Sequence, residues 1–341
     1  MIMNSEVNVA PALKSRDRSI DMAKGILIAM LIFHHIVDVC GQSDVSNVVI
    51  SAMRSIQKQM IVCYFMPAFF MITGICSNFN KPFVPFVKNQ IKSLLIPAVS
   101  FILLFHIYQG DTIRQLGGTI MRLFLFGKDY WFLIALFEAK LLYWFLNKYV
   151  NNSKGIIVIL LALSFTGSLL NTFDISQNFF MHRHVFDLTL YLGVGHLAKS
   201  YYKKQKISVS CLIVFVAVLS VYTIADIKIP YVTYNFATPA PHWVSHVLLS
   251  ISGSYLVLWL SRSIKVDALI EYMGKNSLAI FLMQWYTLFM FVGMASVTLQ
   301  SCTWYESVAV IVSIFVSTIA IGLLVAYICE HSIFKYLMGK F

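Results

Sequence analysis

One apolar segment, residues 20–38, carries ionisable side chains at positions that could bind an anion and move a proton. Lys24 lies near its start, His35 stands eleven residues later, and Asp38 follows one helical turn beyond that histidine. Eleven helical residues make about three turns and roughly 16 Å of rise, so Lys24 and His35 point to nearly the same face. An ionisable group in hydrocarbon costs about 2.5–3.5 kcal/mol on insertion scales. The cluster therefore indicates a functional site that combines anion binding with proton transfer.

The elements that position these side chains are predicted to be membrane helices. The 341 residues are 59% hydrophobic and 12% charged, about half of the roughly 25% charge of a soluble domain. The mean hydropathy is +0.76. Apolar segments of about 20 residues recur, so the sequence predicts an all-α, polytopic membrane bundle of about ten transmembrane helices. They lie near residues 22–40, 60–79, 91–108, 130–148, 155–172, 184–199, 207–226, 243–260, 276–298 and 307–329.

These segments use most of the chain and leave only short loops, which excludes a separate soluble catalytic domain. We expect a polar N-terminal tail at residues 1–18 and a single membrane domain at residues 19–335. Pro67 interrupts the second segment and should free the backbone carbonyl near Cys63. The stretch 119–126 is too short to span a membrane and is typical of an interfacial or re-entrant helix.

The lysines and arginines predict that both termini are cytoplasmic. With the N-terminus inside, 18 of the 26 basic residues fall on the cytoplasmic side and seven on the outer side, as the positive-inside rule requires. The net charge of +11 is then explained by topology and by contact with anionic lipid headgroups. It gives no indication of a nucleic-acid partner.

The cysteines and paired histidines do not predict a metal centre. Six cysteines are scattered without a C-x-x-C pair, so neither a disulfide framework nor a zinc site is expected. His242 and His246 have helical i, i+4 spacing, but no acidic residue accompanies them in the sequence.

Several motifs resemble the acyltransferase-3 family of bacterial integral-membrane O-acyltransferases. The first are Ile20-Asp21, Lys24-Gly25 and His35, followed by Phe65-Met66-Pro67-Ala68-Phe69-Phe70 and Thr73-Gly74. The later ones are Tyr130-Trp131-Phe132-Leu133 and Met273-Gly274-Lys275-Asn276-Ser277-Leu278. Their order and spacing extend over nearly the whole chain.

The resemblance implies transfer of an acyl group, usually acetyl, from cytoplasmic acyl-CoA (acetyl-CoA) to a hydroxyl of a glycan or glycolipid, with no bound cofactor. In that family a basic residue, usually arginine, stands eleven positions before an essential histidine, and the matching residues here are Lys24 and His35. Lysine provides a point charge where guanidinium would provide a bidentate fork. Two histidines common in the family are replaced here by Phe65 and Gln284.

With this chemistry, His35 is the candidate general base, because an imidazole with a pKa near about 6.5 can take the proton of an attacking hydroxyl. Asp38 could orient the ring of His34 or of His35 as a second catalytic residue, although we expect His34 to serve in helix packing. Lys88 and Lys92 share a helical face and could bind the phosphates of the donor.

Further polar residues are candidates for the acceptor path. Glu138 and Lys140 lie within an apolar segment, two residues apart and therefore on different faces, so each needs a partner from another element. Arg183, His184 and Asp187 cluster at the predicted outer end of the sixth segment, where they could bind sugar hydroxyls or form an interfacial polar belt.

We therefore expect a multi-pass O-acyltransferase of the bacterial cytoplasmic (inner) membrane, in contact with membrane lipids. The main alternative is a transporter or flippase for an amphiphilic glycan or lipid, which would also contain interrupted helices and buried ionisable residues. A third possibility is a non-catalytic scaffold that binds polysaccharide-assembly proteins. Direct transfer and an acyl-enzyme relay both remain open, and no G-x-S-x-G elbow indicates a serine intermediate.

Overall fold

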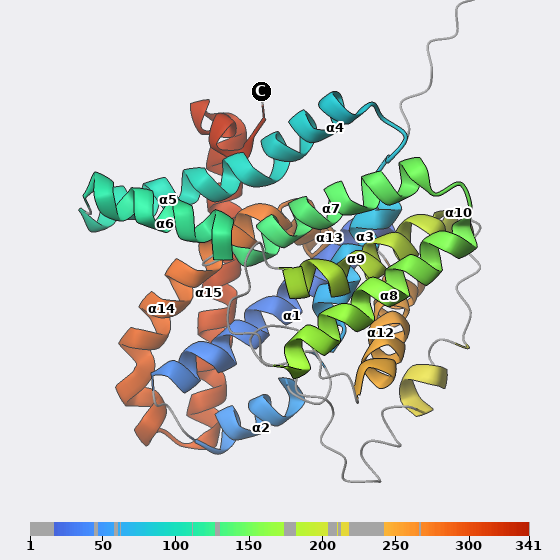
Figure 1. Cartoon of the computed structure of the whole chain (residues 1–341). Helices are drawn as coiled ribbons and strands as arrows, with labels where there is room; N and C mark the ends of the chain where they lie inside the picture. Colours follow the sequence, from blue (N-terminus) through green and yellow to red (C-terminus); the bar gives the residue numbers. More distant parts are fainter. Residues whose placement is uncertain are drawn as a thin grey trace, which may run out of the picture.

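The computed structural model describes residues 17–340 except 44–46, 58–60, 62, 111, 127–129, 174–181, 204–209, 211–212, 218–241 and 266. The helices in these ranges follow one another along the chain as shown in Figure 1. They are α1 (Arg18–Gln42), α2 (Val48–Ile56), α3 (Phe65–Cys76), α4 (Phe83–Gln90), a π-helical turn (Ile91–Leu95), α5 (Ile96–Gln109), α6 (Ile113–Phe126), α7 (Trp131–Tyr149), α8 (Ser153–Thr172), α9 (His182–Leu197), α10 (Lys199–Lys203), α12 (Trp243–Ser263), α13 (Ala268–Lys275), α14 (Ser277–Ser301), α15 (Trp304–His331) and a 3-10 turn (Ile333–Met338).

The helical class predicted from the sequence is confirmed. Six helical segments in the described ranges are long and apolar enough to cross a membrane. They are Arg18–Gln42, Phe83–Ile107, Ser153–Leu170, Trp243–Ser263, Ser277–Ser301 and Trp304–His331. Helices α3, α7 and α9 occupy three more of the predicted segments. The predicted tail and the predicted segment 207–226 lie largely outside the described residues, so ten spans with both ends in the cytoplasm stays a prediction.

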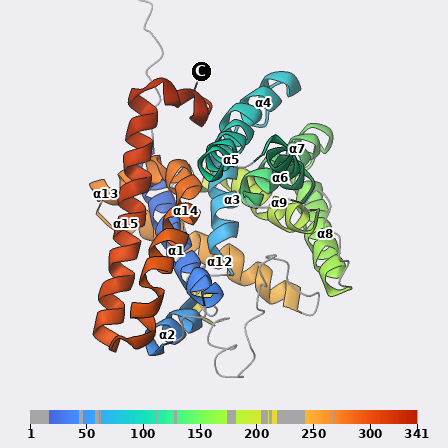
Figure 2. The same cartoon turned by 90° about the vertical axis from the view of Figure 1, so that its left-hand side faces the viewer.

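Helix α1 is the central element of the bundle. It contacts α2, α3, α12, α13, α14 and α15. Figures 1 and 2 show α14 and α15 on one side of α1, and α3, α7, α8 and α9 on the other. The side chain of Asp17 caps the helix by accepting a hydrogen bond from the Ser19 backbone N–H at 3.1 Å. Most of α1 is buried, including Asp21 and His35.

Glycines allow two pairs of helices to touch backbone to backbone. A Cβ added to Gly25 of α1 would overlap the Ile270 carbonyl of α13, and one added to Gly274 would overlap the Asp21 carbonyl of α1. Gly74 of α3 likewise has no room for a Cβ beside α9. Small residues at helix contacts permit close packing in membranes, where lipid is as apolar as leucine. Gly25, Gly74 and Gly274 all belong to the motifs that carry the family resemblance.

Helix α3 begins at Phe65, so Pro67 is its third residue and lies in the first turn, where proline is tolerated. The missing N–H of Pro67 leaves the carbonyl of Cys63 without a helical donor, as the sequence predicts. Ser250 of α12 supplies that donor, with Oγ to O at 2.5 Å. Pro67 therefore starts the helix and does not break it, and the freed carbonyl joins α3 to α12.

An ion-pair cluster also fastens α13 to the start of α1. Glu271 is 6% exposed and accepts hydrogen bonds from Arg18, with Nε to Oε2 at 2.7 Å. The Nζ of Lys275 lies 2.5 Å from its other carboxylate oxygen. These two cations lower the pKa of Glu271 from 4.5 to about 2. Because α14 begins two residues after α13, the cluster helps to fix the position at which α14 enters the bundle.

We predict that Gly274→Ala destabilises the protein, because its methyl group must push α13 away from the backbone of Asp21. Overpacking of this kind costs about 1–3 kcal/mol. The matched control is Gly293→Ala on α14, where nothing lies within 4 Å of the added atom. It should be neutral or slightly stabilising, since alanine favours helix over glycine by about 1 kcal/mol. Thermal unfolding of the two purified variants measures the difference, and equal midpoints would contradict the close contact.

We also predict an acid-dependent loss of stability that depends on Glu271. A carboxyl whose pKa is lowered on folding stabilises the protein above its unfolded pKa, and this contribution is lost as the pH falls from about 4.5 towards about 2. Glu271→Gln should therefore flatten the decline of the unfolding midpoint from about pH 5 to about pH 2, a range that covers this window. Glu330→Gln is the control, because its pair with Lys340 is surface-exposed. An unchanged slope in Glu271→Gln would show that this carboxyl is not linked to folding.

Candidate active site

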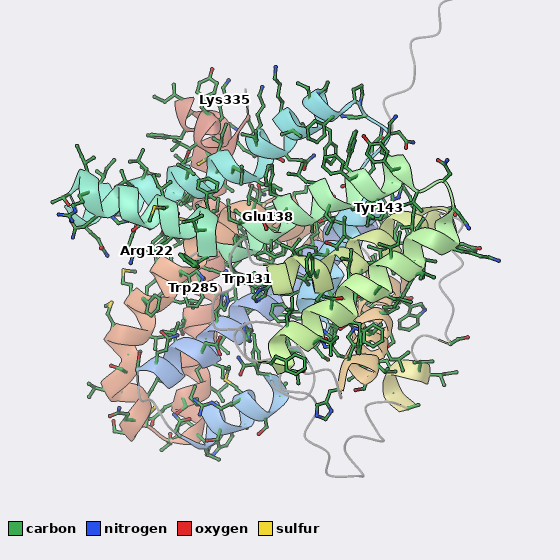
Figure 3. The ribbon with its side chains drawn as sticks, viewed as in Figure 1. Arg122, Trp131, Glu138, Tyr143, Trp285 and Lys335 are labelled. Carbon is green, nitrogen blue, oxygen red and sulfur yellow. The ribbon has the colours of Figure 1, made fainter. Side chains whose placement is uncertain are left out.

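His35 is buried in the middle of the bundle and has an unsatisfied ring nitrogen. It is 7% exposed, and its ring packs on Trp285 of α14 with centroids 4.2 Å apart (Trp285 is labelled in Figure 3). Its Nδ1 has no hydrogen-bond partner among the described residues. The side chain of Gln284 lies beside the ring, but no hydrogen bond of normal geometry joins the two groups. An imidazole held by stacking with a nitrogen left over can accept a proton from a bound molecule.

Asp38 contacts His34 and not the ring of His35. Its Oδ2 lies 3.2 Å from Nε2 of His34, and its Oδ1 accepts a hydrogen bond from Gln57 at 2.9 Å. Nε2 of Gln57 also lies 2.7 Å from Nδ1 of His34. These contacts suit a neutral His34 that accepts at Nδ1 and donates at Nε2.

Of the two rings that Asp38 was predicted to orient, the structure pairs it with His34. The rings of His34 and His35 have centroids 5.2 Å apart, so the ring of His34 links Asp38 to His35. The sequence reasoning gave His34 a role in helix packing and missed its carboxylate partner, for which the i, i+4 spacing of His34 and Asp38 was the available signal.

A cavity of about 360 Å³ lies beside the N-terminal half of α1 and is lined by cations and amides. Three of its ten lining residues are lysines and none of the ten is acidic. The lining residues are Lys24, Thr73, Cys76, Ser77, Asn78, Lys81, Phe86, Asn89, Gln90 and Lys140. Such a cavity offers positive charge together with neutral hydrogen-bonding groups, which is the combination that phosphate groups require.

Lys140 of α7 is the most buried of these cations. It is 9% exposed, and its Nζ donates a hydrogen bond to Oε1 of Gln90 at 2.8 Å. The predicted need for a partner from another element is thus met by the end of α4. Sequence reasoning did not place Lys140 or Lys81 with Lys24, because neither the spacing nor the composition shows which helix faces which.

Lys88 and Lys92, predicted to bind the donor, lie elsewhere on the same stretch of chain. Both are exposed, and neither lines the cavity, whereas Asn89 and Gln90 do. Glu138, labelled in Figure 3, is half-buried on α7, and its i, i+2 spacing from Lys140 places it on a different face of the helix. The structure therefore brings Lys24 into the cavity and leaves Lys88, Lys92 and Glu138 outside its lining.

A second buried polar cluster joins α8, α9 and α12. Asp187 accepts a hydrogen bond from Ser164 at 2.7 Å, and its Oδ2 lies 3.4 Å from Nε2 of His246. Trp243 donates to Ser164 at 2.9 Å. His246 thus has an acidic neighbour that its own sequence region does not contain. No group of three or more potential metal ligands occurs in the part of the chain that the structure describes.

The other predicted residues of the acceptor path are placed only in part. His184 is buried, and its ring lies 5.3 Å from that of Trp131, labelled in Figure 3. Trp131 in turn contacts Phe132, which packs on Phe281 at 5.4 Å, one turn before Trp285 on α14. The side chain of Arg183 lies outside the described residues. Aromatic contacts between α7 and α14 therefore lie between the His35 region and His184.

A family model described as an acyltransferase domain matches residues 17–327, which is nearly the whole chain. No curated protein and no solved structure matches it.

Proposed function

Given that the chain belongs to the acyltransferase-3 family, we propose that it O-acetylates a glycan or glycolipid, with acetyl-CoA as donor, at the bacterial cytoplasmic membrane. Membership of the family makes the protein a membrane acyltransferase in general. The observation that supports the finer proposal is that one helix, α1, carries both Lys24 in a cationic cavity and His35, a buried imidazole with an unpaired nitrogen.

The cavity suits the anionic end of the donor. Lys24, Lys81 and Lys140 line it from three different elements, so their charges converge on one volume with no acidic group among the lining residues to oppose them. The amides of Asn78 and Asn89 add neutral donors and acceptors. Phosphates bound there would leave the thioester arm free to extend along α1 over the roughly 16 Å that separate Lys24 from His35.

At His35 the transfer needs one base and no metal-activated group. The acceptor hydroxyl oxygen attacks the thioester carbonyl carbon while the imidazole takes the hydroxyl proton. The carbon–sulfur bond then breaks, the thiolate of coenzyme A leaves, and the imidazolium returns the proton to sulfur. An ester and free coenzyme A are formed, and the histidine ends in its starting state.

We predict that His35→Ala lowers the rate of thiol release from acetyl-CoA by about 100-fold or more, the usual effect of losing a general base. The measurement is free thiol produced by the purified protein with a pool of glycan acceptors. The control is His331→Ala, an exposed histidine whose ring bonds the carbonyl of Tyr327 on its own helix. Unaltered release in His35→Ala would remove the catalytic assignment. No release by wild-type protein with any acceptor would favour transport.

We predict that Lys24→Met and Lys140→Met each weaken coenzyme A binding about tenfold, which corresponds to about 1.4 kcal/mol. Lys88→Met is the control, because Lys88 is exposed and does not line the cavity. Cys76 provides the readout, since it is an exposed thiol within the lining. Coenzyme A should slow maleimide labelling of Cys76, followed by peptide mass spectrometry. If Lys88→Met weakened protection as much as Lys24→Met, the cavity would not be the donor site.

A further inference from the structure

Gln284 of α14 is a buried amide without hydrogen bonds from its side chain. The residue is 0% exposed, and neither Nε2 nor Oε1 has a partner among the described residues. Buried polar atoms in folded proteins are nearly always hydrogen-bonded, and an exception calls for an explanation, such as a catalytic role or a ligand that binds there. The other buried amides described above are satisfied, Gln57 by His34 and Asp38 and Gln90 by Lys140.

The unsatisfied amide lies at the proposed catalytic base. Gln284 precedes Trp285, whose ring packs on His35, and its carboxamide lies beside the imidazole. Nδ1 of His35 is unpaired as well. Two buried side chains from α1 and α14 thus meet with three polar atoms between them that lack partners in the described structure.

A third unsatisfied group lies at about the same level on α15. Gly322 of α15 packs against Ile280 of α14, and the two helices run antiparallel through a short connection at residues 302–303. Thr318, one turn before Gly322, therefore lies near the level of Gln284, one turn after Ile280. The Oγ1 of Thr318 is buried and also has no hydrogen-bond partner in the described ranges.

We propose that Gln284 is a catalytic residue of the acyl transfer, its Nε2–H donating a hydrogen bond to the carbonyl oxygen of the thioester when that group reaches His35. This inference rests on the proposed function. As the acceptor oxygen bonds to the carbonyl carbon, the carbonyl π electrons move to oxygen, and the hydroxyl proton passes to His35. The amide stabilises the resulting oxyanion until the carbon–sulfur bond breaks and the thiolate leaves.

A carboxamide suits this task better than an ionisable group would. It donates two N–H bonds at any physiological pH and neither gains nor loses a proton during the reaction. Donors placed where negative charge develops, in a site with little water, make a large contribution to catalysis. Glutamate at the same position would present acceptor oxygens to the oxyanion and repel it.

The test compares Gln284→Leu, Gln284→His and Thr287→Val in the full-length protein. Gln284→Leu keeps the volume and removes the donor, so kcat for thiol release should fall about 10²–10³-fold. The KM for acetyl-CoA should stay within about threefold, because the interaction forms only as charge develops. Gln284→His restores an N–H donor and should recover at least about tenfold of the loss, with a pH profile that gains the titration of the new imidazole.

Thr287→Val is the matched control on the same helix. Its hydroxyl bonds the backbone carbonyl of Gln284 at 2.9 Å, within its own helix, so kcat should stay within about threefold of wild type. Wild-type kcat in Gln284→Leu would overturn the proposal. So would a loss of kcat that follows a fall in the unfolding midpoint and in Cys76 protection by coenzyme A, since that indicates a structural role. If His35→Ala abolishes release while Gln284→Leu does not, this inference alone fails; if wild-type protein releases no thiol, the proposed function fails.

Discussion

The arrangement of the site depends on backbone contact between α1 and α13, which only glycine allows. Gly25 and Gly274 each face a main-chain carbonyl of the other helix. The ion pair of Arg18 with Glu271, which Lys275 also contacts, joins the same two helices. Helix α14 starts directly after α13. The distance between α1 and α13 therefore decides whether α14 brings Gln284 and Trp285 against His35. A bulkier residue at either glycine would move two elements of the site together.

The buried polar groups differ in whether other side chains of the protein supply hydrogen-bond partners for them. Asp187 with Ser164 and Lys140 with Gln90 are paired within the protein. Such pairs join the helices that carry them, although Oδ2 of Asp187 has no hydrogen-bond partner among the described residues. His35 and Gln284 instead keep ring and amide atoms unpaired in the described structure, although both are buried. These unpaired atoms can bond a substrate at the reaction centre, whereas Lys140 has a partner and still keeps two N–H donors for the cavity.

The sequence was sufficient for the elements and for one side of the site. Hydrophobic segments predicted the helices because each must be apolar over its own length, and the three-turn spacing of Lys24 and His35 placed both on α1. The sequence did not predict which side chains from other helices would be their partners. Asp38 could orient either of two rings, and spacing alone did not choose. The neighbours of His246 and Lys140 come from elements tens of residues away, so no local pattern reveals them. The sequence likewise does not show that Lys88 lies outside the cavity lining, because the face that α4 turns inward depends on the helices that pack against it.

Helix α1 carries both Lys24, which lines the cationic cavity, and His35, and this fixes the distance between the two side chains. The span between Lys24 and His35 is set by the rise of a continuous hydrogen-bonded rod, about 1.5 Å for each residue, and it does not vary when neighbouring helices shift. Under the proposed function, α1 would therefore set the distance that the donor has to span. A thioester with a much shorter arm could reach the cavity at Lys24 or the imidazole of His35, but not both at once. The enzyme would then select donors with a long arm by length alone, independently of contacts with the acyl group.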